Sequence, residues 1–298
     1  MTTIFRTSPC VPQAGVSLIE LMVSMVIGML VVLAATQLFS GNINASRATQ
    51  SIVQIQDGAR IGFDTLTRHV RMAGYHPVAS LTNFNSGNVA CANQVVQAIC
   101  GINDQGAPTP NLSDEVRVRF WGTDGTVVGT ADSATVDCEG LVVSSTQIVE
   151  ERFHIVNLPT NPGDATTNTP TLVCDVVRGA GNIALGGPVA AQVPLVYGVD
   201  TMQVLYGEDS DGNGNPDIWR NATAANMANV VGVQIAMVLR GEGRNNPSMP
   251  YTYRLFGETY GGAAVGDPGA NFLDPNDQRA RRVVSFSVNL RNRVRTQP

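Results

Sequence analysis

The sequence predicts an α+β protein in which one long N-terminal helix packs on a mostly antiparallel β-sheet domain. The prediction rests on a change of pattern along the chain. From about residue 16 to residue 73 apolar residues follow a helical period, first as an uninterrupted apolar run and then as a single stripe. After Tyr75, short segments of alternating apolar and polar residues are separated by loops rich in Gly, Pro, Asn and Thr.

Composition limits the classes of function. The chain has 298 residues and a formal net charge of −5, and its basic residues are all Arg because it contains no Lys. Nucleic-acid binding relies on clustered positive charge, so no direct nucleic-acid binding is expected. The Arg residues near the C-terminus are interpreted as solvent-facing positions of a strand rather than as a basic binding face: Arg279, Arg281, Arg282, Arg291, Arg293 and Arg295.

The segment from Val16 to Phe39 is 24 residues long and carries one charge, that of Glu20. A helix of this length reaches across a bilayer core at about 1.5 Å per residue. One carboxylate inside it costs roughly 2.5–3.5 kcal/mol on insertion scales, and intramembrane charges are usually paired and functional. A secretory signal peptide cut near residues 32–34 and a plain single-pass anchor are alternatives, but neither explains Glu20.

The residues "GVSLIELMVSMVIGMLVVLAA" resemble the processing site of type IV prepilins and pseudopilins. The resemblance implies a leader, residues 1–15, that a prepilin peptidase removes after Gly15. It also implies N-methylation of the new terminus, Val16, and an assembly role for Glu20, which pairs with the terminal amine of Val16 or of a neighbouring subunit. A charge that is costly alone is compensated by correct stacking, so Glu20 would set the register of assembly.

After the transmembrane and assembly helix at 16–39, residues 40–75 are expected to continue the helix and to pack on the globular domain. Apolar residues at steps of three or four form one stripe: Ile52, Ile55, Ala59, Phe63, Leu66, Val70 and Ala73. Two helices hinged near Gly41-Asn42 are the alternative. His69 falls on the polar side of the helix and is expected to be solvated.

Residues 76–298 are expected to form the β-rich globular domain. "DEVRVRFWG" and "RRVVSFSVNLRN" have the alternation of half-buried strands. Further strand candidates are "TQIVEERFHIVN", "TLVCDVVRG", "VDTMQVLYG", "VVGVQIAMVLRG" and "YTYRLFG". Turn residues mark loops at 101–113, 158–171 and 261–277. His154 is a strand position with no apparent carboxylate partner.

Four cysteines follow the apolar segment, which fits a compartment that permits disulfides: Cys91, Cys100, Cys138 and Cys174. Three pairings are possible, and the simplest joins nearest neighbours, 91 with 100 and 138 with 174. Buried free thiols are the alternative. The spacings do not form a zinc pattern.

The acidic segment "GEDSDGNGNPDIW" (207–219) predicts a calcium loop of EF-hand type with weak affinity. Gly214 stands at the sixth position, where the loop needs a sharp turn, but Arg220 stands at the twelfth in place of a bidentate Glu. Glu208 is expected to compensate. A hairpin turn is the alternative, because the same residue types favour turns. The candidate ligands fall at every second position: Asp209, Asp211, Asn213, Asn215 and Asp217.

Blocks in the helix and in the C-terminal third resemble the PilW family of minor pilins: "IQDGARIGFDTLTRHVRMAGY", "VDTMQVLYGEDSDGNGNPDIW", "ANVVGVQIAMVLRG" and "RARRVVSFSVNLRNR". The resemblance implies a type IV pilin-like fold and a non-enzymatic minor pilin that helps to initiate pilus assembly and sits at or near the tip. Expected partners are other minor pilins, the pilus fibre, the inner membrane and a tip adhesin. The globular domain would be periplasmic in the precursor and later displayed on the pilus or cell surface.

The pilin interpretation has rivals that the sequence leaves open. One is a minor pseudopilin of a type II secretion system, and another is a membrane-anchored binding receptor that does not polymerise. Many PilW relatives carry Gly-Cys soon after the Ala-Gly-Tyr block, whereas this chain delays its Cys to position 91, so the family's disulfide pairing is not carried over. Adhesion, twitching motility and DNA uptake are not distinguished.

Overall fold

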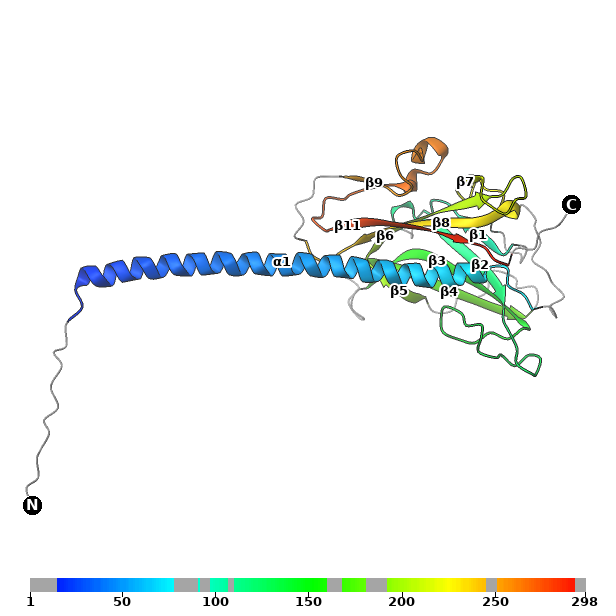
Figure 1. Ribbon diagram of the computed structural model, residues 1–298, viewed down its shortest axis with the longest axis horizontal. Helices are drawn as coiled ribbons and strands as arrows, with labels where there is room; N and C mark the ends of the chain where they lie inside the picture. Colours follow the sequence, from blue (N-terminus) through cyan, green and yellow to red (C-terminus); the bar gives the residue numbers. More distant parts are fainter. Residues whose placement is uncertain are drawn as a thin grey trace, which may run out of the picture. The chain divides into compact units, whose positions relative to one another are not determined.

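The computed structural model describes residues 15–77, 91, 97–106, 110–159, 168–180, 192–244 and 251–292. It divides the chain into two compact units, Met1–Arg47 and Ala48–Pro298. Helix α1 (Leu18–Met72) belongs to both units and has no break at Gly41-Asn42. The second unit holds the sheets, and the predicted α+β class is confirmed (Figure 1).

In the first unit, residues 15–47 form the apolar beginning of α1 and the residues just before it. All of them are exposed, and the most apolar window of α1 has a mean hydropathy of 2.5 with none of it buried. By length and composition, α1 is the one helix among the described residues that is able to cross a membrane.

The second unit is built from antiparallel strands. A five-stranded sheet has the order β1 (Ile99–Ile102), β2 (Glu115–Trp121), β3 (Gln147–Pro159), β4 (Asn168–Ala180) and β5 (Val193–Tyr197). A four-stranded sheet has the order β11 (Arg281–Asn289), β8 (Val230–Arg240), β6 (Val199–Glu208) and β7 (Ile218–Arg220). The short strands β9 (Thr252–Arg254) and β10 (Asn271–Leu273) pair with each other. Four 3₁₀ turns complete the described elements: η1 (Pro110–Leu112), η2 (Met227–Asn229), η3 (Gly262–Val265) and η4 (Pro268–Ala270).

The second half of α1 packs on the sheets through most of its predicted stripe. Ile55, Leu66, Val70 and Ala73 are buried, whereas Ile52 and Phe63 lie exposed at the edge of the contact. The helix approaches closely at two glycines. A Cβ at Gly58 would lie 3.0 Å from Val196 in β5, and one at Gly62 would lie 3.1 Å from Met237 in β8.

One hydrophobic core joins the helix to one face of each sheet. Its largest members are Leu66, Phe120, Phe153, Ile155, Leu172, Met202, Tyr206, Ile235 and Met237. The opposite face of β8 is covered by the β9–β10 region through a smaller cluster: Ala236, Val238, Leu255 and Phe272.

Most of the predicted strands are strands of the sheets, but the predicted burial pattern of β2 is not observed. In β11 the alternation appears as expected, with Val288 buried and Ser285 and Ser287 exposed. In β2 both faces are buried, because Arg119 is 1% exposed and its Nε lies 2.6 Å from the Glu150 carboxylate in β3. The half-buried interpretation of β2 is therefore wrong, since an ion pair replaces the expected solvent on its polar face.

Candidate functional site

Helix α1 begins within the predicted processing motif. Leu18 is its first residue, and residues 15–17 precede it outside the helix. The Ser17 hydroxyl accepts a hydrogen bond from the backbone N–H of Glu20 at 3.3 Å. Ser17 is therefore the N-cap of α1 and Glu20 its N3 residue, which is the residue spacing of a capping box.

Glu20 is exposed in the first turn of the helix. A carboxylate is favourable there, because the unsatisfied N–H groups at a helix N-terminus carry partial positive charge. One turn further on, the Ser24 hydroxyl donates to the Glu20 carbonyl at 2.7 Å, so this polar side chain is satisfied inside the apolar segment. The motif thus places one acid where it both favours the helix start and remains accessible.

The local structure gives no reason for a glycine at position 15. A Cβ on Gly15 would meet no atom within 4 Å, and the same is true at Gly28 and Gly41. The rest of the leader, residues 1–14, lies outside the described residues.

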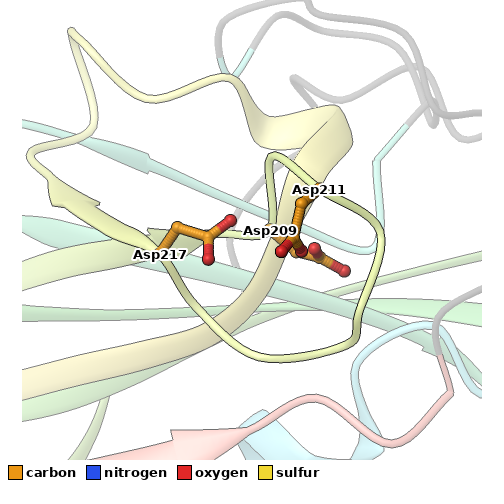
Figure 2. Close-up of side chains that lie close together, drawn as sticks. All are labelled: Asp209, Asp211 and Asp217. Atoms are coloured by element: carbon orange, nitrogen blue, oxygen red, sulfur yellow. The ribbon is translucent and has the colours of Figure 1, made fainter.

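The acidic loop connects β6 to β7. Asp209, Asp211 and Asp217 each present a carboxylate oxygen, and these oxygens lie within 4.8 Å of one another. Among the residues that the structure describes, they are the one group of three or more Asp, Glu, His or Cys side chains that converge in this way. Asp217 lies across the loop from the other two, with its carboxylate facing theirs (Figure 2). Ca²⁺ is a hard cation that takes about six to eight oxygen ligands, so the three carboxylates are able to supply part of such a shell.

Asp209 organises the loop. Its side chain is buried, and its carboxylate accepts hydrogen bonds from the backbone N–H groups of Gly212, Asn213 and Gly214. Gly212 and Gly214 have φ angles of 78° and 91°, a conformation that side chains with a Cβ rarely adopt. Hydrogen bonds within the chain therefore curl the loop around the Asp209 carboxylate.

The other predicted ligands form hydrogen bonds that stabilise the loop. Ser210 donates from its N–H and its hydroxyl to Asp217 at 2.8 and 2.7 Å, and the hydrogen bond from the hydroxyl lowers the pKa of Asp217 most. The Asn213 amide donates to Asp211 at 2.8 Å and accepts from the N–H of Asn215 at 2.7 Å. The structure thus brings the three Asp residues together, while the two Asn residues form hydrogen bonds within the loop.

Glu208 does not compensate for the missing twelfth ligand. Its Oε1 lies 3.4 Å from Nε of Arg220 and accepts a hydrogen bond from the N–H of Asn226 at 3.0 Å. The expectation that Glu208 takes the place of the twelfth ligand is therefore wrong. The acid and the base at the two ends of the loop pair with each other across β6 and β7.

The cysteines of the second unit form two disulfides. Cys91 is bonded to Cys100 with a Cα–Cα distance of 5.4 Å, and Cys138 to Cys174 with a distance of 6.5 Å. The second bond ties the long connection between β2 and β3 to β4. This is the nearest-neighbour arrangement.

The expectation that His69 is solvated is wrong. His69 is 4% exposed, and its Nδ1 lies 2.7 Å from Oε2 of Glu151 in β3. Burial raises the pKa of Glu151, and the neighbouring His69 opposes that rise. The signal that was missed is the pair Glu150-Glu151 inside an apolar strand, because two buried carboxylates require two partners.

His154 also has partners that the sequence did not reveal. Its Nδ1 lies 3.6 Å from Glu115 in β2, and its Nε2 lies 3.3 Å from Asp175 in β4. Burial lowers the pKa of His154, but the two carboxylates outweigh that effect and raise it to about 9. The partners were missed because they come from the two strands that flank β3 in the sheet.

The C-terminal Arg residues are not all solvent-facing. Arg281 is buried, and its Nε lies 2.6 Å from the Asp200 carboxylate. Arg282 and Arg291 are exposed as expected, and residues 293–298 lie outside the described residues. The interpretation fails at Arg281 because a buried acid on β6 faces that strand position.

Family models match two parts of the chain. The family model described as Type IV Pilus-assembly protein W matches residues 160–292, and the Prokaryotic N-terminal methylation motif matches residues 11–36. A type IV-like pilin from Thermus thermophilus is 14% identical with a TM-score of 0.44, and the match covers 80% of this chain and 98% of that one. No curated protein matches the sequence. The two resemblances drawn from the sequence are confirmed.

Proposed function

We propose that this chain, a PilW-like type IV pilin, is a minor pilin that helps to initiate pilus assembly and sits at or near the pilus tip. The observation that carries the proposal is the position of the methylation motif. It lies at the start of an exposed apolar helix that continues into a domain whose C-terminal part matches a pilus-assembly family. The chemistry is assembly rather than catalysis.

The apolar beginning of α1 accounts for membrane anchoring and for polymerisation. An exposed apolar surface of this extent is unfavourable in water, so it must be covered by lipid or by other helices. We propose that lipid of the inner membrane covers it in the precursor, with the domain in the periplasm. Helices of other subunits would then cover it in the fibre, at the pilus or cell surface.

Processing would prepare the helix for that exchange. A prepilin peptidase would cut between Gly15 and Val16, which places the new, N-methylated amine two residues before the first residue of α1. A positive charge at a helix N-terminus opposes the helix dipole, and Glu20 in the first turn offsets it. Pairing of Glu20 with this amine, in the same or a neighbouring subunit, is the step that would select the correct register.

The acidic loop is proposed to bind Ca²⁺ through Asp209, Asp211 and Asp217. Its support is the convergence of three carboxylates in a loop that Asp209 already curls. Weak affinity is expected, because Arg220 replaces the bidentate ligand and pairs with Glu208 instead. Calorimetry on the full chain in detergent tests this: no heat of Ca²⁺ binding that depends on Asp209 at millimolar concentration would contradict it.

The second unit is proposed to contact other minor pilins, the pilus fibre and a tip adhesin. The titratable residues that the structure brings together support a structural role. His69 lies against Glu151, and His154 lies against Glu115 and Asp175, in buried polar contacts between α1 and the strands or between neighbouring strands. Such pairs link elements of the domain and are not placed to meet a substrate.

Mass spectrometry of the N-terminus of the protein from cells tests the central proposal. The wild type should begin at methylated Val16, and Gly15→Ala should remain uncut and absent from surface fibres. Gly41→Ala is the matched control, because a Cβ at Gly41 also meets no atom within 4 Å and the residue lies outside the motif. A processed Gly15→Ala protein in normal fibres, or a wild-type terminus near residue 34, would contradict the proposal.

A further inference from the structure

The sequence contains two Asp-Pro dipeptides, Asp267-Pro268 and Asp274-Pro275, and both lie between β9 and β11. The peptide bond before a proline is a tertiary amide, whose nitrogen carries no hydrogen and leaves as a basic secondary amine. An aspartyl carboxyl is also able to reach its own backbone carbonyl carbon by closing a five-membered ring. The side chain is therefore able to cut such a bond without help from another residue.

Both aspartates are buried, but they have different partners. Asp274 is 4% exposed, and its Oδ1 lies 3.2 Å from Nη1 of Arg281 and accepts a hydrogen bond from the N–H of Asn276 at 2.8 Å. Asp267 is fully buried and forms no ion pair within the described residues, and its Oδ2 accepts a hydrogen bond from the Tyr260 hydroxyl at 2.7 Å. A carboxylate held by a guanidinium is a weak nucleophile and has no proton to give, so Asp267 is the more reactive of the two.

Hydrogen bonds fix the backbone of Asp267 and leave one atom of its side chain unpartnered. The Asp267 N–H donates to the Gly262 carbonyl at 3.0 Å, and the Asp267 carbonyl accepts from the N–H of Ala270 at 3.3 Å. This second hydrogen bond would stabilise negative charge on the carbonyl oxygen when the carbonyl carbon is attacked. Oδ1 of Asp267 is buried and has no hydrogen-bond partner. A buried polar atom without a partner is costly, so the fold leaves Oδ1 available for reaction.

The surroundings of Asp267 favour its protonated form. Burial raises the pKa of the Asp267 carboxyl, and the hydrogen bond from Tyr260 opposes that rise only in part. Burial also raises the pKa of Tyr260, so its hydroxyl remains a donor. The other titratable groups that face this site are the carboxyls of Asp104 and Asp114. A neutral Asp267 carboxyl keeps the proton that the leaving nitrogen requires.

We propose that the chain cuts itself between Asp267 and Pro268. The Asp267 carboxyl attacks its own backbone carbonyl carbon, so a bond forms from a carboxyl oxygen to this carbon and the bond from this carbon to the Pro268 nitrogen breaks. The carboxyl proton passes to the Pro268 nitrogen, which leaves as a secondary amine. Water then opens the cyclic anhydride and restores two carboxyl groups on Asp267. The steps add up to hydrolysis of one peptide bond, with water as the co-reactant.

The cut would separate the last part of the fold from the chain that precedes it. Elements η4, β10 and β11 follow the cut, and β10 pairs with β9 while β11 pairs with β8 along its 9 residues. Strand β11 would therefore stay in place through hydrogen bonds and packing, and it would become detachable when the second unit unfolds. This inference does not rest on the proposed assembly role or on the calcium loop.

Intact-protein mass spectrometry of the purified full chain in detergent tests the proposal. At about pH 5, where tryptophan fluorescence checks that the chain is folded, the wild type should accumulate a fragment that ends at Asp267 and one that begins at Pro268. The bond after Asp274 should stay intact in the same sample. The cut should slow as the pH rises, because Asp267 then loses its proton. In urea at the same pH the preference for Asp267 should be lost, since the two dipeptides then have similar surroundings.

Pro268→Ala is the decisive variant, because it replaces the tertiary amide by a secondary amide and leaves Asp267 in place. This variant should remain uncut, as should Asp267→Ala, and fluorescence shows whether each variant folds. Pro275→Ala is the matched control and should be cut like the wild type. A folded wild type that yields no fragment ending at Asp267 would overturn the proposal. Equal cutting at both Asp-Pro bonds of the folded chain, or unchanged cutting of Pro268→Ala, would also overturn it and would indicate acid hydrolysis only.

Discussion

Nε of Arg281 lies 2.6 Å from the carboxylate of Asp200, and this contact joins β11 to β6 past the strand β8 that separates them. The Arg281 side chain is fully buried, and it also contacts the carboxylates of Asp274 and Asp277 at 3.2 and 2.6 Å. A single guanidinium therefore holds acids from β6 and from the segment between β10 and β11. Its desolvation is tolerable only because these hydrogen bonds surround it.

Arg281→Met is expected to destabilise the second unit strongly. The substitution keeps an apolar stem of similar length but leaves the buried Asp200 without this partner, and breaking a buried pair from one side costs about 3–5 kcal/mol. Urea unfolding of the purified chain, followed by tryptophan fluorescence, measures the change. Arg282→Met is the matched control, because Arg282 is the next residue on β11 and is exposed, so its effect should stay within about 0.5 kcal/mol. Equal effects of the two variants would contradict this role of Arg281.

Stability is expected to fall as the pH rises from neutral to mildly alkaline values. The carboxylates around His154 raise its pKa from 6.5 to about 9, although burial acts in the opposite direction. A raised pKa means that protonated His154 stabilises the fold fully below pH 6.5, and that this contribution is lost as the pH rises through about 9. At about 1.4 kcal/mol per pKa unit, the loss is roughly 3 kcal/mol in the free energy of unfolding.

The free energy of unfolding measured between pH 6 and pH 10 checks the role of His154. His154→Gln should remove most of the slope in this range, whatever its effect on stability at neutral pH. His76→Gln is the control, because within the described residues the His76 ring contacts the carbonyl of Pro77 and forms no ion pair, so this variant should keep the wild-type slope. A wild-type slope in the His154 variant would show that another group is responsible.

The close approach of α1 to the sheets predicts a steric effect at Gly58. A Cβ there would lie 3.0 Å from Val196 and 3.1 Å from Leu239, so Gly58→Leu forces the helix away from β5 and β8 and should cost about 1–3 kcal/mol. Gly41→Leu, at an exposed position of the same helix, should not destabilise the second unit. The urea midpoint at an unchanged m value measures the difference. Similar midpoints for both variants would contradict the tight packing at Gly58.

The sequence predicted well those features that depend on neighbouring residues. The helix, most long strands and the processing motif follow from spacing alone, and the alternation in β11 survives because Ser285 and Ser287 do face solvent. The convergence of the loop carboxylates also follows from local spacing, since alternate residues of a curled loop share one side. Features that a short segment encodes through its hydrophobic period or its turn-forming residues were therefore predictable from the sequence.

Features that depend on the order of strands in a sheet could not be predicted from local sequence patterns. Arg119 looks like a solvent-facing residue until β3 places Glu150 opposite it, and His154 looks unpaired until β2 and β4 flank it. The strand at 193–197 was missed because it is short, lies at the edge of its sheet and contains Pro194. Asp104, which follows β1, accepts a hydrogen bond from the N–H of Gly269, and no local pattern predicts this contact.

Glu20 supports a prediction that separates membrane insertion from assembly. Glu20→Gln keeps the size and the hydrogen-bonding capacity of the side chain but removes its charge, so insertion should be preserved or slightly favoured. Incorporation into sheared surface fibres should fall at least about tenfold, since the terminal amine of Val16 would enter the helix bundle without a counter-charge. Immunoblots of membrane and fibre fractions give both quantities.

Ser24→Ala is the control. It lies one turn away in the same segment and should leave insertion and incorporation unchanged, because it removes a local hydrogen bond and no charge. Wild-type incorporation of Glu20→Gln would mean that the acid serves only the helix start that its contact with Ser17 indicates.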